Sequence, residues 1–588
     1  MSLIPILRSL GKKVCLIVLL WGVFVMNMSS QAQVRSADPL AEKIRELALE
    51  YQNKKAQGYD VNEVEETLRH IREARERGDR QEFIRLLKKA ETQLKEAKSP
   101  AEQPVLPVKQ AEKTSNQGAI YLDQGPWPMY CHDPQHTCRS PYEGLTEPPT
   151  KPKWKFNSPG GHGISSPTVI GSNGRVYTGT WKNDLFLKDK AKGHSGTLCA
   201  LSPKGSLDWL HDSDRGSLLA SAIESSPLLT SDGKIIYGKD DGHVYAVTSR
   251  GELVWDFACD DPFKPEAPYD DNEQVIPSPV IGKDGTLYVC SHWGNVYNPT
   301  VVREMSRRIP RIKELGIKPV KKPLWGKLYA INVQTGSRKW VYDPSLDSPS
   351  HKRVMWGSPA IGDDGTIYFT CYDGNSYNGY LYALNPAGIK KWRFPKNDGE
   401  KIDALQSSPS IGRDGTIYVG SFGGKNKARL FALNPDGSLK WSYEVAENRI
   451  TSTPGIGPDG TIYVGAHNWG FLFNPNMSVK GHMYAIEDSR NGPKLKWKFE
   501  VEYGVLAPPA IDSRGNIFFG TDGDPLIKGK TGDFHLYALN HQGQKLWSYP
   551  LKGSVYSPPV IDRDGTIYVG TTMGDAALYA FGPKRGKE

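Results

Sequence analysis

The chain has 588 residues, which is enough for one large repeat domain and a small accessory domain. Gly 60, Pro 43 and Tyr 28, with short apolar runs separated by Gly, Asn and Asp, favour β structure over an ordinary α/β enzyme. The net charge of +9 is mild for this length, and the basic residues are spread along the chain without a nucleic-acid-binding motif, so no nucleic-acid partner is expected.

Residues 1–32 have the pattern of a secretory signal peptide. Basic residues between Arg8 and Lys13 precede an apolar stretch from Val14 to Met26, and Ser30-Gln31-Ala32 is a small-x-small cleavage site. We therefore predict an exported protein that is periplasmic, attached to the cell envelope or secreted, with at most peripheral membrane association after cleavage. The alternative is an uncleaved anchor, since the apolar stretch is short for a bilayer span.

Residues 33–98 are predicted to form about three short amphipathic helices. They are rich in Glu, Lys, Arg, Ala and Leu at helical spacing, with helix starts at Asp38-Pro39, after Gly58 and after Gly78-Asp79. Such helices bury little surface alone, so they form a local bundle or coiled-coil stalk, or they bind a partner or a second copy. Residues 99–124, with prolines among polar residues, are predicted to be a linker.

A self-similar unit recurs eight times in residues 125–588 and decides the fold. Its clearest copy is SSPSIGRDGTIYVG from Ser407, followed by LFALNPDGSLKWSYEV from Leu430. Each unit reads as four strands: a Ser-Pro strand, a tight Asp-Gly turn into a Tyr-bearing strand, an LYAL-like strand and a Trp-bearing strand. The tryptophans of the last strand are Trp154, Trp209, Trp255, Trp340, Trp392, Trp441, Trp497 and Trp547.

The first of these tryptophans precedes every other repeat element, and the LYAL-like strand at Leu578 has no Trp strand after it. The simplest arrangement pairs KWKF at residues 153–156 with the last unit. Such pairing removes the exposed edges that an open array would leave. We predict an all-β, eight-bladed β-propeller closed by an N-terminal strand and preceded by a small α-helical segment.

The blades resemble the tryptophan-docking repeats of quinoprotein (pyrroloquinoline quinone-like) propellers. AINVQTGSRKW at residues 330–340 is most similar to that repeat, and the resemblance covers about residues 125–582. WPMYCHDPQHTCRSPY at residues 127–142 resembles the opening segment of exported proteins with these repeats. Cysteines stand there at positions where glycine is expected, which favours a local disulfide between Cys131 and Cys138.

The chemistry of quinoprotein dehydrogenases is only weakly supported. Those enzymes carry adjacent cysteines near the quinone and often a Cys-x-x-Cys-His haem site, and this sequence has neither. CHDPQHTC matches no strong zinc spacing, and the Asp-x-Asp-Gly motifs lack the acidic residue that a calcium loop requires, so no metal site is predicted. GDPLIKGKT from Gly523 has one residue too many for a phosphate loop. No cofactor is predicted, with pyrroloquinoline quinone and calcium as the alternative.

Successive strands of a blade are antiparallel, so the loops divide between two faces of the ring. Turns between first and second strands and between third and fourth strands are short and share one face, here called the short-turn face. The other connections are long and irregular and share the long-loop face, which is the candidate for binding. Its aromatic, acidic and histidine residues suit protein anchors or sugar stacking. The candidates are Trp181, Asp240, Asp241, His292, Trp293, Tyr372, Asp373, Phe422, His467, Trp469, Asp522 and Asp524.

The insertion from Val301 to Lys322 adds eight basic residues, which fit an acidic partner or a solvated basic face equally well. The leading hypothesis is a non-catalytic scaffold of the cell envelope with one or more envelope protein partners. In general plan it is similar to the propeller subunit of outer-membrane protein assembly machinery. The alternatives are a quinone-dependent dehydrogenase and a glycan-binding module, because fold alone does not assign function.

Overall fold

The computed structural model describes residues 80–96, 121–181, 196–212, 222–260, 273–293, 326–347, 353–373, 376–397, 400–423, 426–468, 480–523 and 532–583, with residues 47, 64, 67, 70 and 71. The chain divides into two units, Met1–Asn116 and Gln117–Glu588, which are described separately. Within the described residues, no helix is long and apolar enough to cross a bilayer. The predicted signal peptide and residues 99–120 of the predicted linker lie outside the described residues.

The first unit contains helix α4 (Arg80–Glu96), at the position of the third predicted helix. Leu86, Leu87, Ala90 and Leu94 recur at helical spacing and are buried, while Glu82–Arg85 and Glu91–Lys95 ion pairs lie on its surface. Leu47, Val64 and Ile71 are buried as well, and Thr67 donates a hydrogen bond to Gln93 at 2.7 Å. Thr67 therefore contacts α4 through Gln93.

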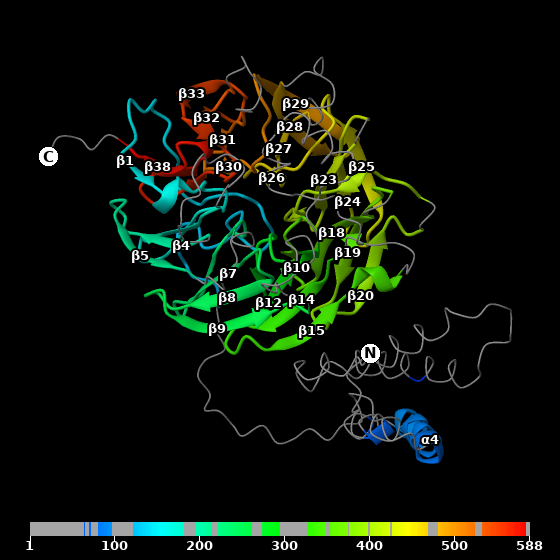
Figure 1. The fold of residues 1–588 in the computed structure, drawn as a ribbon. Helices are drawn as coiled ribbons and strands as arrows, with labels where there is room; N and C mark the ends of the chain where they lie inside the picture. Colours follow the sequence, from blue (N-terminus) through cyan, green and yellow to red (C-terminus); the bar gives the residue numbers. More distant parts are fainter. Residues whose placement is uncertain are drawn as a thin grey trace, which may run out of the picture. The chain divides into compact units, whose positions relative to one another are not determined.

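The second unit is a ring of eight four-stranded antiparallel blades, as predicted (Figure 1). Blades 1 to 3 are, from the innermost strand outward, β2 (Val169–Ile170), β3 (Val176–Gly179), β4 (Leu198–Leu201), β5 (Leu207–His211); β6 (Leu228–Leu229), β7 (Ile235–Gly238), β8 (His243–Val247), β9 (Leu253–Ala258); and β11 (Val280–Ile281), β12 (Thr286–Cys290), β14 (Leu328–Asn332), β15 (Arg338–Tyr342). Blades 4 and 5 are β17 (Ala360–Ile361), β18 (Ile367–Asp373), β19 (Gly379–Leu384), β20 (Lys390–Phe394); and β22 (Ser410–Ile411), β23 (Ile417–Phe422), β24 (Arg429–Leu433), β25 (Leu439–Glu444).

Blades 6 to 8 complete the ring. They are β26 (Gly455–Ile456), β27 (Ile462–Ala466), β28 (Gly481–Ser489), β29 (Gly492–Val501); β30 (Ala510–Ile511), β31 (Ile517–Gly520), β32 (His535–Leu539), β33 (Lys545–Pro550); and β35 (Val560–Ile561), β36 (Ile567–Gly570), β38 (Ala577–Phe581), β1 (Trp154–Asn157). Short additional strands lie on the long-loop side: β10 (Glu273–Gln274) with β13 (His292–Trp293), β16 (Arg353–Val354) with β18, β21 (Ala404–Leu405) with β23, and β34 (Gly553–Ser554) with β37 (Thr572–Gly574). Among the described residues, the short 3₁₀ helices Pro159–Gly161 and Pro344–Asp347 lie between strands.

Strand β1 supplies the outermost strand of the eighth blade. It pairs antiparallel with β38, with Trp154 opposite Ala580 and Lys155 opposite Tyr579. The pairing joins segments that are more than four hundred residues apart in the sequence. The four strands of that blade therefore come from both ends of the second unit.

Each outer-strand tryptophan docks on the next blade. Trp340 Nε1, for example, donates to the Pro386 carbonyl oxygen at 3.0 Å, and its ring lies against Gly388. Gly388 has φ +82, which favours glycine, and a side chain there would also lie 2.8 Å from the indole. Trp441 uses the carboxylate of Asp488 because the β28–β29 hairpin is long, and Trp547 uses the Leu145 carbonyl oxygen. Leu145 takes this place because β38 has no following turn within its own blade.

The Asp-Gly turns of the short-turn face use their own carboxylates. In blade 5, Asp414 Oδ1 accepts a hydrogen bond from the Thr416 backbone N–H at 3.0 Å, and Lys440 from the outer strand lies 3.6 Å from Asp414 Oδ2. The same arrangement recurs at Asp284, Asp364, Asp459 and Asp564. These contacts make the motif a hairpin turn, in agreement with the sequence interpretation.

Candidate functional site

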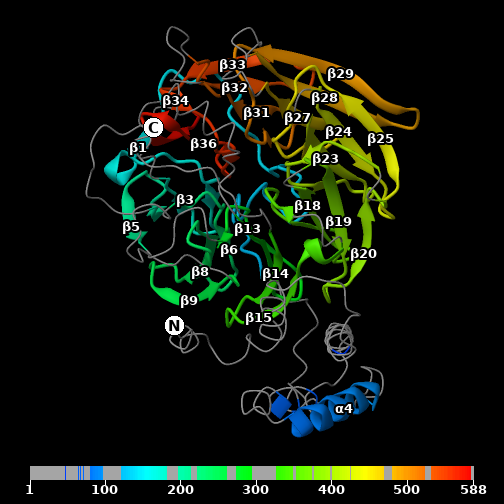
Figure 2. The ribbon, with the colours of Figure 1, turned by 45° about the vertical axis from the view of Figure 1, so that its right-hand side comes forward.

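Residues 127–142, which we call the axial segment, run round the middle of the ring. Backbone N–H groups of the innermost strands donate to it: Ile170 to Trp127, Leu229 to Pro128, Ile361 to Pro134, Ile411 to Gln135, Ile456 to Thr137 and Ile511 to Cys138, all at 2.8–2.9 Å. The segment thus bonds to six of the eight blades, and its blue-to-cyan trace crosses the centre in Figure 2. The innermost strands surround a central channel along the axis of the ring. Because the donors lie at the short-turn ends of these strands, the axial segment occupies the short-turn end of the channel.

The axial segment is held in an unusual backbone conformation. Cys131, His132, His136 and Cys138 all have φ between +50 and +76, a region in which glycine is least strained. Cys131 and Cys138 are joined by a disulfide, and both are buried. The left-handed backbone at the two cysteines accounts for the expectation of glycine there, and the disulfide constrains the segment in the channel.

The other end of the channel is a cavity of about 180 Å³. Every blade contributes to its lining the residue four positions before the innermost strand; we call these the axial residues, and residues that follow them, such as Ser278 and Pro508, line the cavity as well. The axial residues are Ser165, Glu224, Ile276, Trp356, Gln406, Thr451, Leu506 and Tyr556. Tyr130 of the axial segment forms the floor, and its hydroxyl shares a 2.7 Å hydrogen bond with Thr453. The cavity therefore opens on the long-loop face.

Serine hydroxyls below the axial residues join neighbouring blades. Ser278 Oγ accepts from the Ser226 backbone N–H at 2.9 Å, Ser358 Oγ from Ser278 at 2.8 Å, and Ser408 Oγ from Ser358 at 2.9 Å. The Ser-Pro motif of the repeat thus forms part of the cavity wall. Its hydroxyls satisfy buried backbone groups where strands of different blades meet.

Glu224 is the acidic residue in the cavity lining, and the buried Asp240 lies near it. Burial raises the pKa of Glu224 to about 7. Burial, followed by the charges of Glu224 and Asp241, raises the pKa of Asp240 well above its usual value, and Lys239 opposes this effect. Asp240 is 3% exposed, and its Oδ1 has no hydrogen-bond partner among the described residues. The site therefore holds carboxyl groups that are poorly compensated in their charged form.

Trp356 connects the cavity to two predicted site residues. Its indole Nε1 donates to the Tyr372 hydroxyl at 3.0 Å, and its ring meets the His292 ring edge-to-face with centroids 4.6 Å apart. His292 is buried, and burial lowers its pKa to about 4, so the imidazole is neutral at physiological pH. Tyr372 is buried against Tyr377. These contacts fix the orientation of Trp356.

Gln406 connects the cavity to a second group of predicted residues. Arg449 donates to Gln406 Oε1 at 2.7 Å, and its guanidinium lies 5.0 Å from the centre of the Phe422 ring. Burial lowers the pKa of Arg449 to about 10. Burial, with a smaller effect from Arg449, lowers the pKa of His467 well below its usual value. Phe422 and His467 also form backbone bridges to Arg449. They therefore help to position Arg449, which in turn binds Gln406.

Of the other predicted site residues, Asp522 contacts the axial residue Tyr556, and the rest that the structure describes are spread round the ring. Asp241 accepts hydrogen bonds from the His243 backbone and the Tyr245 hydroxyl, and buried Asp373 lies 3.8 Å from Arg353. Trp181 bridges Gly163, and Asp522 accepts from Tyr556 at 3.5 Å. Trp293 pairs through its backbone with Glu273. Trp469, Asp524 and residues 301–322 lie outside the described residues.

None of the eight axial residues was among the candidates predicted from the sequence. The candidates include only neighbours of Trp356, Gln406, Glu224 and Tyr556, because they were chosen from loops and not from strand starts. A signal was present, since aligning the eight repeats on their Ser-Pro strands shows one position that holds Ser, Glu, Ile, Trp, Gln, Thr, Leu and Tyr in turn. A position that varies so widely inside a regular repeat marks a surface that the repeat does not need for its own structure.

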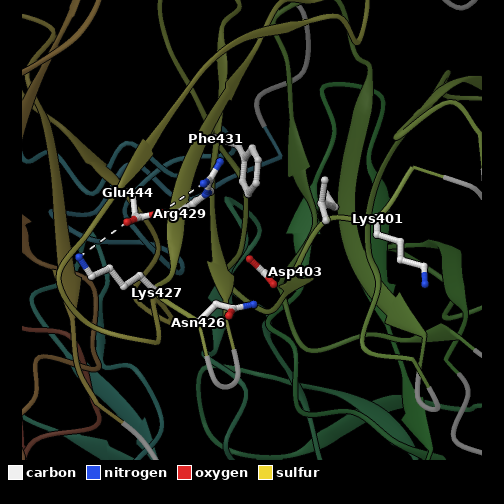
Figure 3. Close-up of a pocket in the computed structure, with 8 residues that line it drawn as sticks. Lys401, Asp403, Asn426, Lys427, Arg429, Phe431 and Glu444 are labelled. Atoms are coloured by element: carbon white, nitrogen blue, oxygen red, sulfur yellow. Dashed lines mark hydrogen bonds and ion pairs between the residues drawn. The ribbon is translucent and has the colours of Figure 1, made fainter.

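A second recess lies between the chain before β21 and strand β24, with a volume of about 520 Å³. Figure 3 shows Lys427, Arg429 and Glu444 as one linked group beside Phe431, with Asp403 opposite and Lys401 pointing away. Glu444 lies 3.2 Å from Arg429 and 3.7 Å from Lys427. Because these charges already neutralise one another, this recess is a weaker candidate than the axial cavity.

Comparisons with known proteins agree with the geometry of the ring. Residues 324–529 match the sequence profile of the family described as "Outer membrane protein assembly factor BamB". The chain resembles the quinoprotein-like β-propellers. The solved structure of a europium-containing methanol dehydrogenase has a TM-score of 0.54 and 14% identity over 78% of this chain and 98% of that one.

Two further structures of quinoprotein-like propellers are similar. Quinohemoprotein alcohol dehydrogenase ADHIIG from Pseudomonas putida HK5 has a TM-score of 0.54 and 14% identity, covering 79% of this chain and 82% of that one. BamB from Moraxella catarrhalis has a TM-score of 0.43 and 11% identity, covering 73% and 98%. No curated protein matches the chain in sequence. At these identities the dehydrogenases show the quinoprotein-like fold and nothing more.

The axial cavity does not fit the quinone of such dehydrogenases. Pyrroloquinoline quinone is a planar tricarboxylic acid, and buried carboxylates need cationic or hydrogen-bonding partners. Among the described residues that line the cavity, none is Lys, Arg or His, and Glu224 adds a carboxyl group. The volume of about 180 Å³ is also below the usual range for cofactor pockets.

Proposed function

We propose that this protein is a non-catalytic, extracytoplasmic binding scaffold that uses the long-loop face of its propeller. One observation carries the proposal: the axial segment occupies the short-turn end of the channel, while a cavity to which every blade contributes an axial residue faces the long loops. Differing side chains on a rigid ring form a surface suited to specific recognition.

Two further observations support this function. The profile match is to a family described as an outer membrane protein assembly factor, whose description is one of assembly rather than of catalysis. Residues 1–32 have the pattern of an export signal, which would bring the ring to the cell envelope. The expected partner is accordingly an envelope protein, bound by aromatic anchors such as Trp356 and Tyr556.

The first experiment separates a scaffold from a quinone enzyme. Purified protein is incubated with pyrroloquinoline quinone and calcium and then passed through a gel-filtration column. We expect no quinone absorbance in the protein peak and no dye-linked oxidation of alcohols, because Glu224 would repel the quinone carboxylates. Bound quinone together with dye-linked oxidation would contradict the proposal.

The second experiment locates the binding face. A photo-crosslinking phenylalanine analogue replaces Tyr377, which lies between β18 and β19 on the long-loop face and is 38% exposed. The matched control carries the analogue at Arg413, an exposed residue in the β22–β23 turn on the short-turn face. Illumination of native envelopes should give discrete adducts from position 377 only. Adducts of equal strength from both positions, or from 413 alone, would refute the assignment.

A further inference from the structure

We propose that the axial cavity binds an ammonium group, carried by a lysine side chain of a protein partner or by a free organic amine. The inference rests on the proposed function, because the cavity opens on the proposed binding face. It is carried by three features of the cavity wall: aromatic rings, a carboxyl group without a described partner, and the lack of a cation among the described lining residues.

The aromatic wall comes from three separate parts of the ring. Tyr130 lies on the floor, Trp356 belongs to blade 4 and Tyr556 to blade 8. The contacts of Trp356 with Tyr372 and His292 hold its indole in place, so its face is preorganised. Aromatic faces attract ammonium groups, most strongly where water is displaced.

The charges point to the same ligand. Burial is the only cause of the raised pKa of Glu224, with no contribution from a hydrogen bond or a cation among the described residues. The neighbouring Asp240 has a buried Oδ1 without a hydrogen-bond partner among those residues. The other titratable groups of this side are Asp241, His243 and Lys239, whose Nζ lies 3.9 Å from Asp241 Oδ2. Burial raises the pKa of Asp241 as well; Lys239 opposes the rise at Asp240 and at Asp241, and His243 also opposes it at Asp241. Arg449 lies behind Gln406 in another part of the ring, where it contacts Phe422.

Uncharged oxygen atoms complete the wall. Ser165 Oγ and Thr451 Oγ1 line the cavity without hydrogen-bond partners among the described residues. An ammonium group has three N–H donors and no acceptor, so it can pair with a carboxylate and two such hydroxyl oxygens at once. A ligand with carboxylate groups, such as pyrroloquinoline quinone, would instead place its negative charge against these hydroxyl oxygens and against Glu224.

The test measures binding by isothermal titration with n-butylammonium, with n-butanol as its uncharged counterpart. A short peptide with one internal lysine forms a second arm, and methyl glucoside a third. We expect butylammonium to bind and butanol and glucoside not to bind. Tighter binding of the lysyl peptide assigns the ammonium group to a protein partner, whereas binding of the free amine alone assigns it to a small molecule.

Variants show where the amine binds. Glu224→Gln should weaken butylammonium binding by about tenfold or more, because a charge-assisted hydrogen bond is lost, and Glu224→Asp should retain part of the affinity. The control is Glu252→Gln, the same change in the same blade, at an exposed turn of the short-turn face. Unchanged affinity in a folded Glu224→Gln protein, or equal binding of butanol, would overturn the proposal.

The affinity should also depend on pH. A cation binds the ionised form of Glu224, whose pKa of about 7 reflects burial, so affinity should rise by about thirtyfold between pH 5.5 and 8. Glu224→Gln should remove most of this rise. Crosslinking at position 377 does not use the cavity, so crosslinks without amine binding would reject this inference and leave the scaffold function standing.

Discussion

The outer edge of the ring and its axis differ in how much the contributing residue varies from blade to blade. At the outer edge, all eight blades repeat one device, in which a tryptophan indole donates a hydrogen bond to the next position of the ring, to the following blade in seven cases and to Leu145 in the case of Trp547. At the axis, each blade contributes a different side chain to the cavity. Uniformity indicates a structural requirement, and variation on the same scaffold indicates a binding surface.

The largest effect should come from removing one outer-edge tryptophan. Trp340→Ala removes the hydrogen bond to Pro386 and the contact with Gly388, which should cost about 3 kcal/mol of unfolding free energy. Thermal unfolding or urea titration measures the loss. Trp340→Phe should cost about 1 kcal/mol, since it mainly removes the hydrogen bond. Leu346→Ala, at a side chain 71% exposed, is the control and should change little.

This prediction concerns the strands and blades of the ring, which the sequence predicts well. The spacing of Ser-Pro, Asp-Gly, LYAL and Trp motifs locates strands and blades because each repeat obeys the same local physics. The path of residues 127–142 could not be predicted in this way. These residues are held by backbone hydrogen bonds to residues of the innermost strands, such as Ile170 and Ile511. Backbone hydrogen bonds do not depend on residue type, so the sequence contains no pattern that predicts them.

The candidate site shows the same division. His292, Tyr372, Phe422 and His467 were expected on the long-loop face, and the structure places them beside Trp356 or Arg449. Their role as supports could not be inferred, because it depends on contacts between different blades. Glu224 and the other axial residues were missed because a strand start in a regular repeat looks structural until the eight copies are compared.

Two glycines of the short turns test how much the contact between a glycine and the outer-edge tryptophan contributes to stability. Gly437 and Gly460 both have φ close to +80, but a side chain at Gly437 would lie 2.5 Å from the Trp392 ring, whereas Gly460 faces open space. Gly460→Ala should cost about 1 kcal/mol from backbone strain alone. Gly437→Ala should cost about 3 kcal/mol because the indole must also move. Equal losses of melting temperature would mean that the indole contact is unimportant.

The disulfide tests how strongly the axis depends on the axial segment. Replacing both Cys131 and Cys138 by serine opens a loop with a sequence separation of 7, and the expected loss is about 2 kcal/mol. Urea unfolding of the variant is compared with that of the wild-type protein with and without reductant. Reductant should lower the stability of the wild type and leave the variant unchanged. A variant as stable as the oxidised wild type would show that backbone bonds alone fix the segment.

The smallest effect concerns Glu224 and distinguishes a binding surface from a structural one. Its folded-state pKa of about 7 lies above the ordinary value of 4.5, so its contribution to stability is present below pH 4.5 and is lost as pH rises through 7. Glu224→Gln removes that loss while keeping the shape of the side chain. The variant should match the wild type at pH 4.5 and exceed it at pH 8 by on the order of 1 kcal/mol, after allowance for partial exposure. Paired thermal unfolding at the two pH values measures the difference, with Glu252→Gln as control. A binding residue is expected to lower the stability of the protein while the cavity is empty and to gain a partner when a ligand binds. If Glu224→Gln is equally or less stable than the wild type at pH 8, Glu224 is instead a structural residue of the ring.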